Sequence, residues 1–421
     1  MIDFSLLLEK APSGWDNFRL VDICTRVQGN YQPNPNGTRL YLGLEHLAQG
    51  FPMLVGKGNE TEVKSSKNTF RPNDVLFGKL RPYLRKCVLM QEEGVCSTDI
   101  LVFRANDKVL PKYLCYLCHT DQFVGYAKAT TSGVQHPRTS WNSLSEFRLT
   151  LPPISEQHRI AHVLATVQTA IEQQARLIAL TRELKSALMH KLFTEGLRGE
   201  KQKETEIGLA PESWVVVELG DYADFKNGIN FSAGDKGTGI LTIDVLNMYG
   251  EGCSVSLDNL YRVNKRLDES YLLEEDDLLF VRSSLKREGV GWTSLFIPTN
   301  EPVTFCGFII RARMKDKTAF SSRFLTNYCR TNIARNRLVS GSGQVAITNI
   351  NQGLLRDLPV PHPSIEEQED IVSAIDTIDK KISILLQKQA NLKELFRTLL
   401  HQLMTGQIRV NEIDLNILTG E

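Results

Sequence analysis

The chain has 421 residues, enough for about three domains that each bury a core of their own. Its 49 lysines and arginines equal its 49 aspartates and glutamates, so any attraction to nucleic acid has to come from local clusters of cations. No segment approaches the ~20 consecutive apolar residues of a membrane helix and no leader-like segment opens the chain, so we expect a soluble, cytoplasmic protein.

Residues 1–150 are expected to form an α+β domain, because short strand-like runs such as "DVLF" and "DILVF" alternate with turn-rich loops and one or two helices. A basic stretch between Arg71 and Met90 holds five cations against one acidic residue. Clustered cations neutralise phosphate charge, although a solvated basic face is the other interpretation. The candidates for DNA contact in this stretch are Lys79, Arg81, Tyr83, Arg85 and Lys86.

A second candidate segment is the loop "TSGVQHPR", residues 131–138, which precedes the last expected strand of this domain. Its glycine permits close approach of the backbone to a ligand, and its polar side chains can hydrogen-bond to base edges. The candidates for DNA contact here are Ser132, Gly133, Gln135 and Arg138, with Gln135 as a base reader.

The eight cysteines lack the spacing of a disulfide framework, so reduced thiols are expected. Cys115, Cys118 and His119 in "KYLCYLCHTDQF" superficially match a haem-attachment or zinc pattern. Haem attachment would need an exported protein, and zinc would need a second ligand pair nearby. Because the apolar residues of this segment recur at helical spacing, we expect buried structural cysteines and no metal site.

A long helix is expected within residues 151–200, after the entry "LPPISEQ". Its apolar residues recur at alternating spacings of three and four, which is typical of a helix that packs on another through a coiled-coil seam. Late in the helix, Leu177, Leu180 and Leu184 suggest a drift to an adjoining face. The expected seam positions are Ile160, Leu164, Val167, Ile171, Gln174, Ile178, Leu188 and Leu192.

A polar linker, "LRGEKQKETEIGLAPES", leads into a second α+β segment, residues 201–358. Its basic stretch, from Arg311 to Arg337, holds eight cations against one acidic residue. Its loop "SGSGQVAITN", residues 340–349, occupies the same place as residues 131–138 in the first segment. The candidates for DNA contact are Arg282, Ser283, Lys286, Arg287, Ser342, Gly343 and Gln344, with Gln344 as a base reader.

A second long helix is expected within residues 359–421, after the related entry "VPHPSIEEQ". Its apolar residues follow the same alternating spacing, interrupted only by Gln389. The expected seam positions are Ile371, Ile375, Ile378, Ile382, Leu385, Gln389, Leu392, Phe396, Leu399 and Leu403.

The two halves of the chain are an internal repeat. The matched residues are Trp15 with Trp214, Asp74 with Asp277, Arg104 with Arg313, Gln157 with Gln368 and His190 with His401. The separation between matched residues increases through the globular segments and is constant through the helices. Loops absorb insertions, whereas a seam that must stay in register does not. We therefore expect an approximate twofold repeat.

The two helices are expected to run antiparallel, because the short linker places the start of the second helix near the end of the first. An alignment that puts Ile160 opposite Leu403 also puts Gln174 opposite Gln389, where the two amides could pair and fix the register. Two unrelated, solvent-leaning glutamines are the alternative. From Ile160 to Leu192 the helix would measure ~50 Å and act as a rigid spacer.

The chain itself contains no recognisable catalytic motif. An adenine methyltransferase would need a glycine-rich cofactor turn and an Asn/Asp-Pro-Pro-aromatic element, and "LPPI" lacks the polar first residue. A translocating ATPase would need GxxxxGK[ST], and "GFPMLVGKGN" has the wrong spacing. A DNA-recognition protein is therefore favoured. The alternatives are a restriction enzyme with a cryptic nuclease or methyltransferase site, and a purely structural scaffold.

These motifs together resemble the specificity subunits of type I restriction-modification systems. The resemblance rests on both proline-containing entries, the helix endings "HKLFTEG" and "HQLMTGQIRV", the run "DVLFGKLRPYLRK" and the linker "TEIGLAPESW". The second entry departs from the first at His362 and by one extra residue.

The resemblance implies two target recognition domains, residues 1–150 and 201–358, that each read one half of a split, asymmetric DNA site. It implies that the helical regions, residues 151–200 and 359–421, form an antiparallel coiled coil that sets the spacing and docks two methyltransferase subunits. Nuclease-translocase subunits would join for cleavage. S-adenosylmethionine, ATP and Mg²⁺ would belong to those partners, so no cofactor and no catalysis are expected in this chain.

Overall fold

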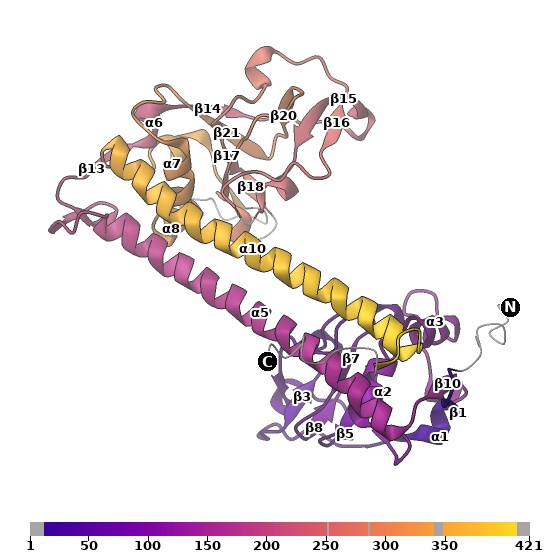
Figure 1. Ribbon diagram of the computed structural model, residues 1–421. Helices are drawn as coiled ribbons and strands as arrows, with labels where there is room; N and C mark the ends of the chain where they lie inside the picture. Colours follow the sequence, from indigo (N-terminus) through magenta and orange to yellow (C-terminus); the bar gives the residue numbers. More distant parts are fainter. Residues whose placement is uncertain (1–11, 251, 285–286, 341–347, 411–421) are drawn as a thin grey trace. The chain divides into compact units, whose positions relative to one another are not determined.

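The computed structural model describes residues 12–250, 252–284, 287–340 and 348–410. By its internal contacts the chain divides into two compact units. Unit 1 contains residues 1–175 and 388–421, and unit 2 contains residues 176–387. Each unit thus combines one globular domain with parts of two long helices (Figure 1).

The globular domain of unit 1 is built from short strands in two four-stranded sheets and one strand pair. The strands are β1 Asp16–Arg19, β2 Cys24–Val27, β3 Leu40–Leu42, β4 Gly58–Asn59, β5 Asn68–Phe70, β6 Asp74–Gly78, β7 Cys87–Leu89, β8 Gly94–Cys96, β9 Ile100–Ala105 and β10 Arg148–Leu151. The antiparallel sheet has the order β2-β9-β6-β7. The mixed sheet has the order β4-β3-β8-β5, with β3 and β8 parallel. Strand β1 pairs with β10, directly before the first long helix.

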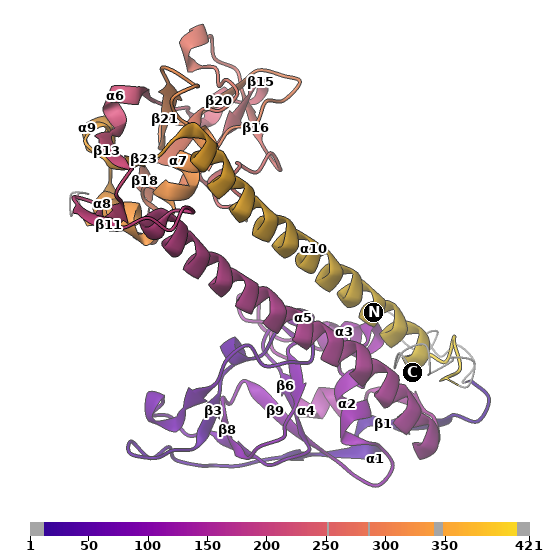
Figure 2. The same ribbon diagram turned by 60° about the vertical axis from the view of Figure 1, so that its left-hand side comes forward.

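Short helices cover the antiparallel sheet of unit 1. They are α1 Leu20–Ile23, α2 Pro111–Leu117, α3 Asp121–Ala129 and α4 Trp141–Leu144. The fixed φ of Pro111 suits the first position of α2, and the Thr120 side chain caps α3 by accepting a hydrogen bond from the Phe123 amide. Figure 2 shows α2 beside the first long helix, α5 (Ile154–Glu195). There the Tyr116 hydroxyl donates to Gln168 Oε1 at 2.9 Å.

The globular domain of unit 2 repeats this plan. Its strands are β11 Gln202–Thr205, β12 Gly208–Pro211, β13 Val215–Glu218, β14 Ala223–Asn227, β15 Lys236–Ile243, β16 Tyr261–Val263, β17 Leu278–Val281, β18 Ser283–Ser284, β19 Thr293–Leu295, β20 Val303–Phe305, β21 Ile309–Met314, β22 Thr348–Asn349 and β23 Pro359–His362. Its short helices are α6 Leu219–Tyr222, α7 Ser322–Cys329, α8 Asn332–Ser340 and α9 Gln352–Arg356. The sheet β14-β21-β17-β19 has the connectivity of β2-β9-β6-β7, and β15 pairs parallel with β20 as β3 does with β8.

Matched side chains make matched bonds in the two units, which confirms the internal repeat. Arg104 grips the buried carboxylate of Asp74 through Nε at 2.8 Å and Nη2 at 2.7 Å, and Arg313 grips Asp277 at the same two distances. Gln157 caps the entry to α5 by donating to the Pro152 carbonyl, at 3.0 Å. Gln368 donates in the same way to the Pro363 carbonyl.

The second long helix, α10, covers Ile365–Met404. In unit 1 the start of α5 and the end of α10 share one hydrophobic core, which includes Ile160 and Leu403. In unit 2 the end of α5 and the start of α10 share another, which includes Leu192 and Ile371. An ion pair of 2.6 Å between Lys185 and Asp379 lies within one residue of the expected alignment. The helices are therefore antiparallel, as expected from the short linker and the alignment of the two helices.

The seam is close to the predicted one. Its buried members are Ile160, Leu164, Val167, Ile171, Gln174, Ile178, Leu192, Ile371, Ile375, Ile382, Leu385, Phe396 and Leu403, while Leu188, Ile378, Leu392 and Leu399 are half-buried. The expected drift of the seam is wrong, because Leu177, Leu180 and Leu184 are 44%, 51% and 59% exposed.

The two glutamines of the predicted pair lie in unit 1 at the seam. Gln174 is buried, and Gln389 is half-buried. Gln389 Oε1 accepts a hydrogen bond from Lys393 at 3.2 Å. The pairing of the two amides stays a prediction.

All eight cysteines are buried as free thiols, as expected. Among the described residues, none of the helices has a stretch apolar and long enough to traverse a lipid bilayer.

Candidate nucleic-acid interface

In unit 1 the structure brings the two predicted DNA-contact segments together. The Arg81 amide donates to the Pro137 carbonyl at 2.8 Å, and the Thr139 amide donates to the Lys79 carbonyl at 3.1 Å. Ser132 and Arg138 close the second segment into a hairpin with two backbone hydrogen bonds of 2.9 and 3.0 Å. The segments, far apart in sequence, therefore form one surface.

The turn between β6 and β7 presents Arg81 to solvent. It consists of one 3₁₀ turn, Pro82–Leu84, flanked by Arg81 and Arg85, whose φ angles are 50° and 51°. Left-handed backbone at residues other than glycine is uncommon and marks a turn that its surroundings hold in place. The Arg81 side chain is exposed, with Nη2 3.5 Å from the Gln135 carbonyl oxygen.

An acidic residue neutralises two of the candidate cations. The carboxylate of Asp99 accepts from Arg138 Nε at 2.9 Å and Nη2 at 3.1 Å, and Lys79 Nζ lies 3.9 Å away. The hydrogen bonds from Arg138 lower the pKa of Asp99, and the charges of Arg138 and Lys79 lower it further. Arg81 is thus the candidate cation of this surface that keeps most of its charge available for a phosphate.

The remaining candidates of the basic stretch hold the turn in place. Arg85 donates to the His119 carbonyl at 2.9 Å and pairs with Asp121, while Lys86 donates to the Leu44 carbonyl at 2.5 Å. Tyr83 is 46% exposed, and together with Arg85 it lines a pocket of about 510 Å³ beside α10. Arg85 and Lys86 therefore bond to the body of unit 1, whereas Tyr83 stays largely exposed.

Unit 2 assembles the equivalent surface. Strand β18 pairs with β22, which puts Ser283 beside Asn349, and the two side chains are hydrogen-bonded. Arg282 is half-buried and donates to the Gly307 carbonyl at 3.4 Å, while Arg287 is exposed in a 3₁₀ turn. The predicted contacts Lys286, Ser342, Gly343 and Gln344 lie outside the described residues.

A family model described as "Type I restriction modification DNA specificity domain" matches the chain twice, at residues 12–182 and 211–394. The two matches span most of the chain and coincide with the two repeats. The chain belongs to this family.

Individual members of the family are similar over nearly their whole length. The type I restriction enzyme MjaVIII specificity subunit of Methanocaldococcus jannaschii is 22% identical, over 96% of this chain and 95% of its own. The StySPI specificity subunit of Salmonella potsdam is 23% identical, over 91% and 88%. A solved S subunit from M. genitalium has a TM-score of 0.54 at 15% identity and covers 94% of this chain and 98% of that one, which is a likeness of fold.

The two surfaces differ at one position that the sequence analysis did not single out. In unit 1 the Lys79 amide donates to the Asp99 carbonyl at 2.9 Å, and in unit 2 the Arg282 amide donates to the Phe308 carbonyl at 2.7 Å. Asp99 and Phe308 therefore occupy equivalent places. Phe308 is 55% exposed. The repeat alignment, which pairs Arg104 with Arg313, contains this substitution, and a comparison of polarity along it could have found it.

The basic stretch of unit 2 needs a correction. Arg330 donates to the Thr293 and Gly252 carbonyls and lies 4.7 Å from the Trp292 ring centre, and burial lowers its pKa to about 10. Arg335 donates to the Val290 and Glu288 carbonyls. Arg311 is buried, and Arg313 is paired with Asp277. These four guanidinium groups bind the protein itself, so the expected phosphate-facing cluster is wrong for them.

Proposed function

We propose that this chain is the DNA sequence-recognition subunit of a type I restriction-modification complex. Each globular domain would read one half of a split, asymmetric site. The observation that carries this proposal is the repeated surface, in which a turn of the main sheet meets the segment before the last strand: Arg81 with Pro137 in unit 1, and Ser283 with Asn349 in unit 2. Exposed polar loops on a rigid sheet are the usual place for base contacts.

The repeated scaffold with two different surfaces supports recognition of an asymmetric site. A protein that read two identical half-sites would need the same side chains at matched positions. Here Lys79 matches Arg282, and the acidic Asp99 matches the apolar Phe308. The Asp99 carboxylate holds Arg138 and Lys79 in a charge-neutral group, whereas the exposed phenyl ring of Phe308 could contact a thymine methyl group, so the two surfaces suit different bases.

The long helices would dock the methyltransferase subunits of the complex. Leu177, Leu180 and Leu184 follow one another on α5 at spacings of three and four, and all three are exposed. In unit 2 they form an apolar ridge outside the seam. A ridge with this spacing suits an amphipathic partner helix, and covering it would remove apolar surface from water. Nuclease-translocase subunits would join that assembly for cleavage.

Catalysis would lie in the partner subunits, which would bring S-adenosylmethionine, ATP and Mg²⁺. The competing function is a restriction enzyme with its own cryptic active site. Incubating the purified chain alone with DNA and these three compounds separates the two. We expect binding to DNA without cleavage or methyl transfer. Cleavage or methylation by the lone chain, lost on denaturation, would contradict the proposal.

The number of residues in α5 and α10 would set the gap between the two half-sites. Four residues added after Lys185, with four more after Ile378 to keep the seam matched, lengthen each helix by ~6 Å. We expect methylation-site sequencing with the partner subunits to show a longer gap and unchanged half-sites. The gap need not grow by a whole number of ~3.4 Å steps, because DNA can twist to follow the protein. An unchanged gap would refute this part of the proposal.

A further inference from the structure

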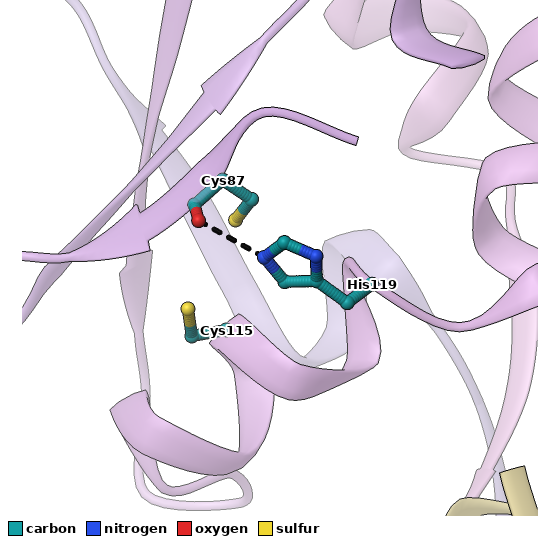
Figure 3. Close-up of side chains that lie close together, drawn as sticks. All are labelled: Cys87, Cys115 and His119. Carbon is teal, nitrogen blue, oxygen red and sulfur yellow. Dashed lines mark hydrogen bonds between the residues drawn. The ribbon is translucent and has the colours of Figure 1, made fainter. Parts of the chain in front are cut away.

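A buried cluster of thiols and imidazole lies in unit 1 beside the turn that carries Arg81. It consists of Cys87 at the start of β7, Cys115 in α2 and His119 just after α2 (Figure 3). One potential ligand atom from each residue lies within 4.8 Å of the other two, and all three residues are buried. Among the described residues this is the one group of His, Cys and acidic side chains that is both buried and close enough to hold a metal ion.

A fourth donor is close at hand. Cys118 follows Cys115 by three residues, which places both thiols on the same face at the end of α2. Cys118 is not among the three residues whose ligand atoms all lie within 4.8 Å of one another, so its side chain would have to turn toward the ion to serve as the fourth ligand. Three cysteines and one histidine are a ligand set that structural zinc sites use.

The His119 ring could exchange its present hydrogen bond for a bond to a metal ion. Its Nε2 lies 2.9 Å from the Cys87 carbonyl oxygen, while Nδ1 is buried and has no hydrogen-bond partner among the residues that the structure describes. Figure 3 shows the ring directed at Cys87, with its Nε2 edge toward the two sulfur atoms. Ligation through Nε2 would replace one neutral hydrogen bond with a metal–imidazole bond.

We propose that Cys87, Cys115, Cys118 and His119 form a structural zinc site. Zinc is favoured over harder cations because the donors are thiolates and an imidazole, and because three cysteines with one histidine are a ligand set of structural zinc sites. Binding would release one proton from each coordinating thiol, so affinity should increase with pH. The absence of a second cysteine pair in the local sequence is no obstacle, since the fold brings Cys87 to the "CYLCH" segment.

The zinc site would hold the turn between β6 and β7 against α2. Cys87 is two residues from Arg85, whose guanidinium already donates to the carbonyl of the ligand His119 at 2.9 Å. A metal bonded to both sides of this contact would fix the end of the turn that begins at Arg81. The zinc site itself does not rest on the proposed DNA-recognition function and can be tested without DNA.

The test uses the full-length chain, without a histidine tag, purified under reducing conditions. Elemental analysis is expected to find about one zinc ion per chain. Cys115→Ser should lose most of this zinc, whereas Cys96→Ser should retain it. Cys96 is a matched control, because it is also fully buried in unit 1, in β8, outside the cluster.

A second measurement does not depend on whether a variant folds. The wild-type chain, stripped of metal with a chelator, is titrated with Co²⁺ and followed by absorption. Thiolate-to-cobalt charge-transfer bands in the near ultraviolet, with intense visible bands of tetrahedral cobalt, would support the site. No zinc together with no thiolate–cobalt band would overturn it, and so would zinc fully retained by Cys115→Ser.

Discussion

Asp99 in the first recognition domain and Phe308 in the second occupy equivalent places, yet they give the two surfaces opposite character. Asp99 holds Arg138 and Lys79 in a group of nearly balanced charge, which leaves Arg81 as the exposed candidate cation of its surface. Phe308 leaves an exposed phenyl ring beside Arg282. The difference shows that the two units share a backbone arrangement and that a single side chain gives each surface its own polarity.

Matched substitutions in the two globular domains should lower stability by similar amounts, because the two domains share one backbone arrangement. Arg104→Ala and Arg313→Ala each leave a carboxylate, Asp74 or Asp277, that is 1% exposed and without its ion pair. We expect each variant to lose roughly 2–4 kcal/mol, the lower part of the range for a broken buried pair because the guanidinium groups are partly exposed. Chemical denaturation measures the free energy of unfolding, and hydrogen exchange shows which domain is destabilised. Arg397→Ala removes an exposed pair with Glu394 and serves as the control. A loss of stability in only one of the two variants would show that the two ion pairs are not equivalent.

The surface of unit 1 should gain affinity when its acidic residue is removed. Asp99→Asn frees Arg138 and Lys79 and removes a negative charge near the expected phosphates. We therefore expect DNA binding to tighten by roughly tenfold, and the slope of log K against log salt to steepen by about one. Glu92→Gln removes a charge from an exposed pair with Lys57 in the same domain and is the control. Weaker binding by Asp99→Asn would mean that Asp99 contacts a base itself.

The surface of unit 2 should behave differently. Phe308→Ala removes an apolar contact without changing charge, so we expect about a fivefold loss of discrimination between cognate and altered half-sites. The salt dependence of binding should not change. Leu209→Ala truncates another exposed apolar side chain of unit 2 and is the control. A changed salt slope would indicate that Phe308 acts by positioning Arg282.

Arg81 tests the phosphate contact of the first surface. Arg81→Ala should weaken binding to all sequences by a few-fold and reduce the salt slope by about one, because a phosphate contact carries no base information. Lys57→Ala is a control at an exposed cation in the same domain. Competition binding at several salt concentrations distinguishes this from a loss restricted to the cognate site, which would assign Arg81 to a base.

The helical seam, shared by both units, should give the smallest effect. Gln174→Leu together with Gln389→Leu exchanges amides at the seam for apolar packing, so we expect a gain of less than about 1 kcal/mol in stability and a less strictly fixed register. Thermal unfolding and spin-label distances across the seam measure both. An unchanged melting temperature with an unchanged register would remove any role for these amides in specifying the alignment.

The helices and the repeat could be predicted from the sequence because periodic patterns report them directly. The alternating spacing located the seam residues of both helices, such as Ile160 in α5 and Leu403 in α10. Matched residues such as Gln157 and Gln368 located the repeat. The misplaced drift toward Leu184 arose because Lys185, a polar residue, occupies a seam position through its ion pair with Asp379.

The site was less predictable because charge in a sequence does not show its partners. Arg330 and Arg335 look the same as Arg81 in a list of cations, yet they bind carbonyl groups around Trp292. The proximity of Cys87 to His119 depends on strand β7 meeting α2, which local spacing does not encode. The meeting of the turn at Arg81 with residues 131–138 is likewise a product of the sheet.

The most direct test of the account is to replace residues 201–358 with the corresponding domain of a family member that recognises a different site, and to sequence methylated sites with the partner subunits present. If each domain reads its own half-site, the half-site assigned to the second domain changes, while the other half-site and the gap between them stay the same. A change in both half-sites, or in the gap, would contradict the claim that the two domains read independently on a common frame.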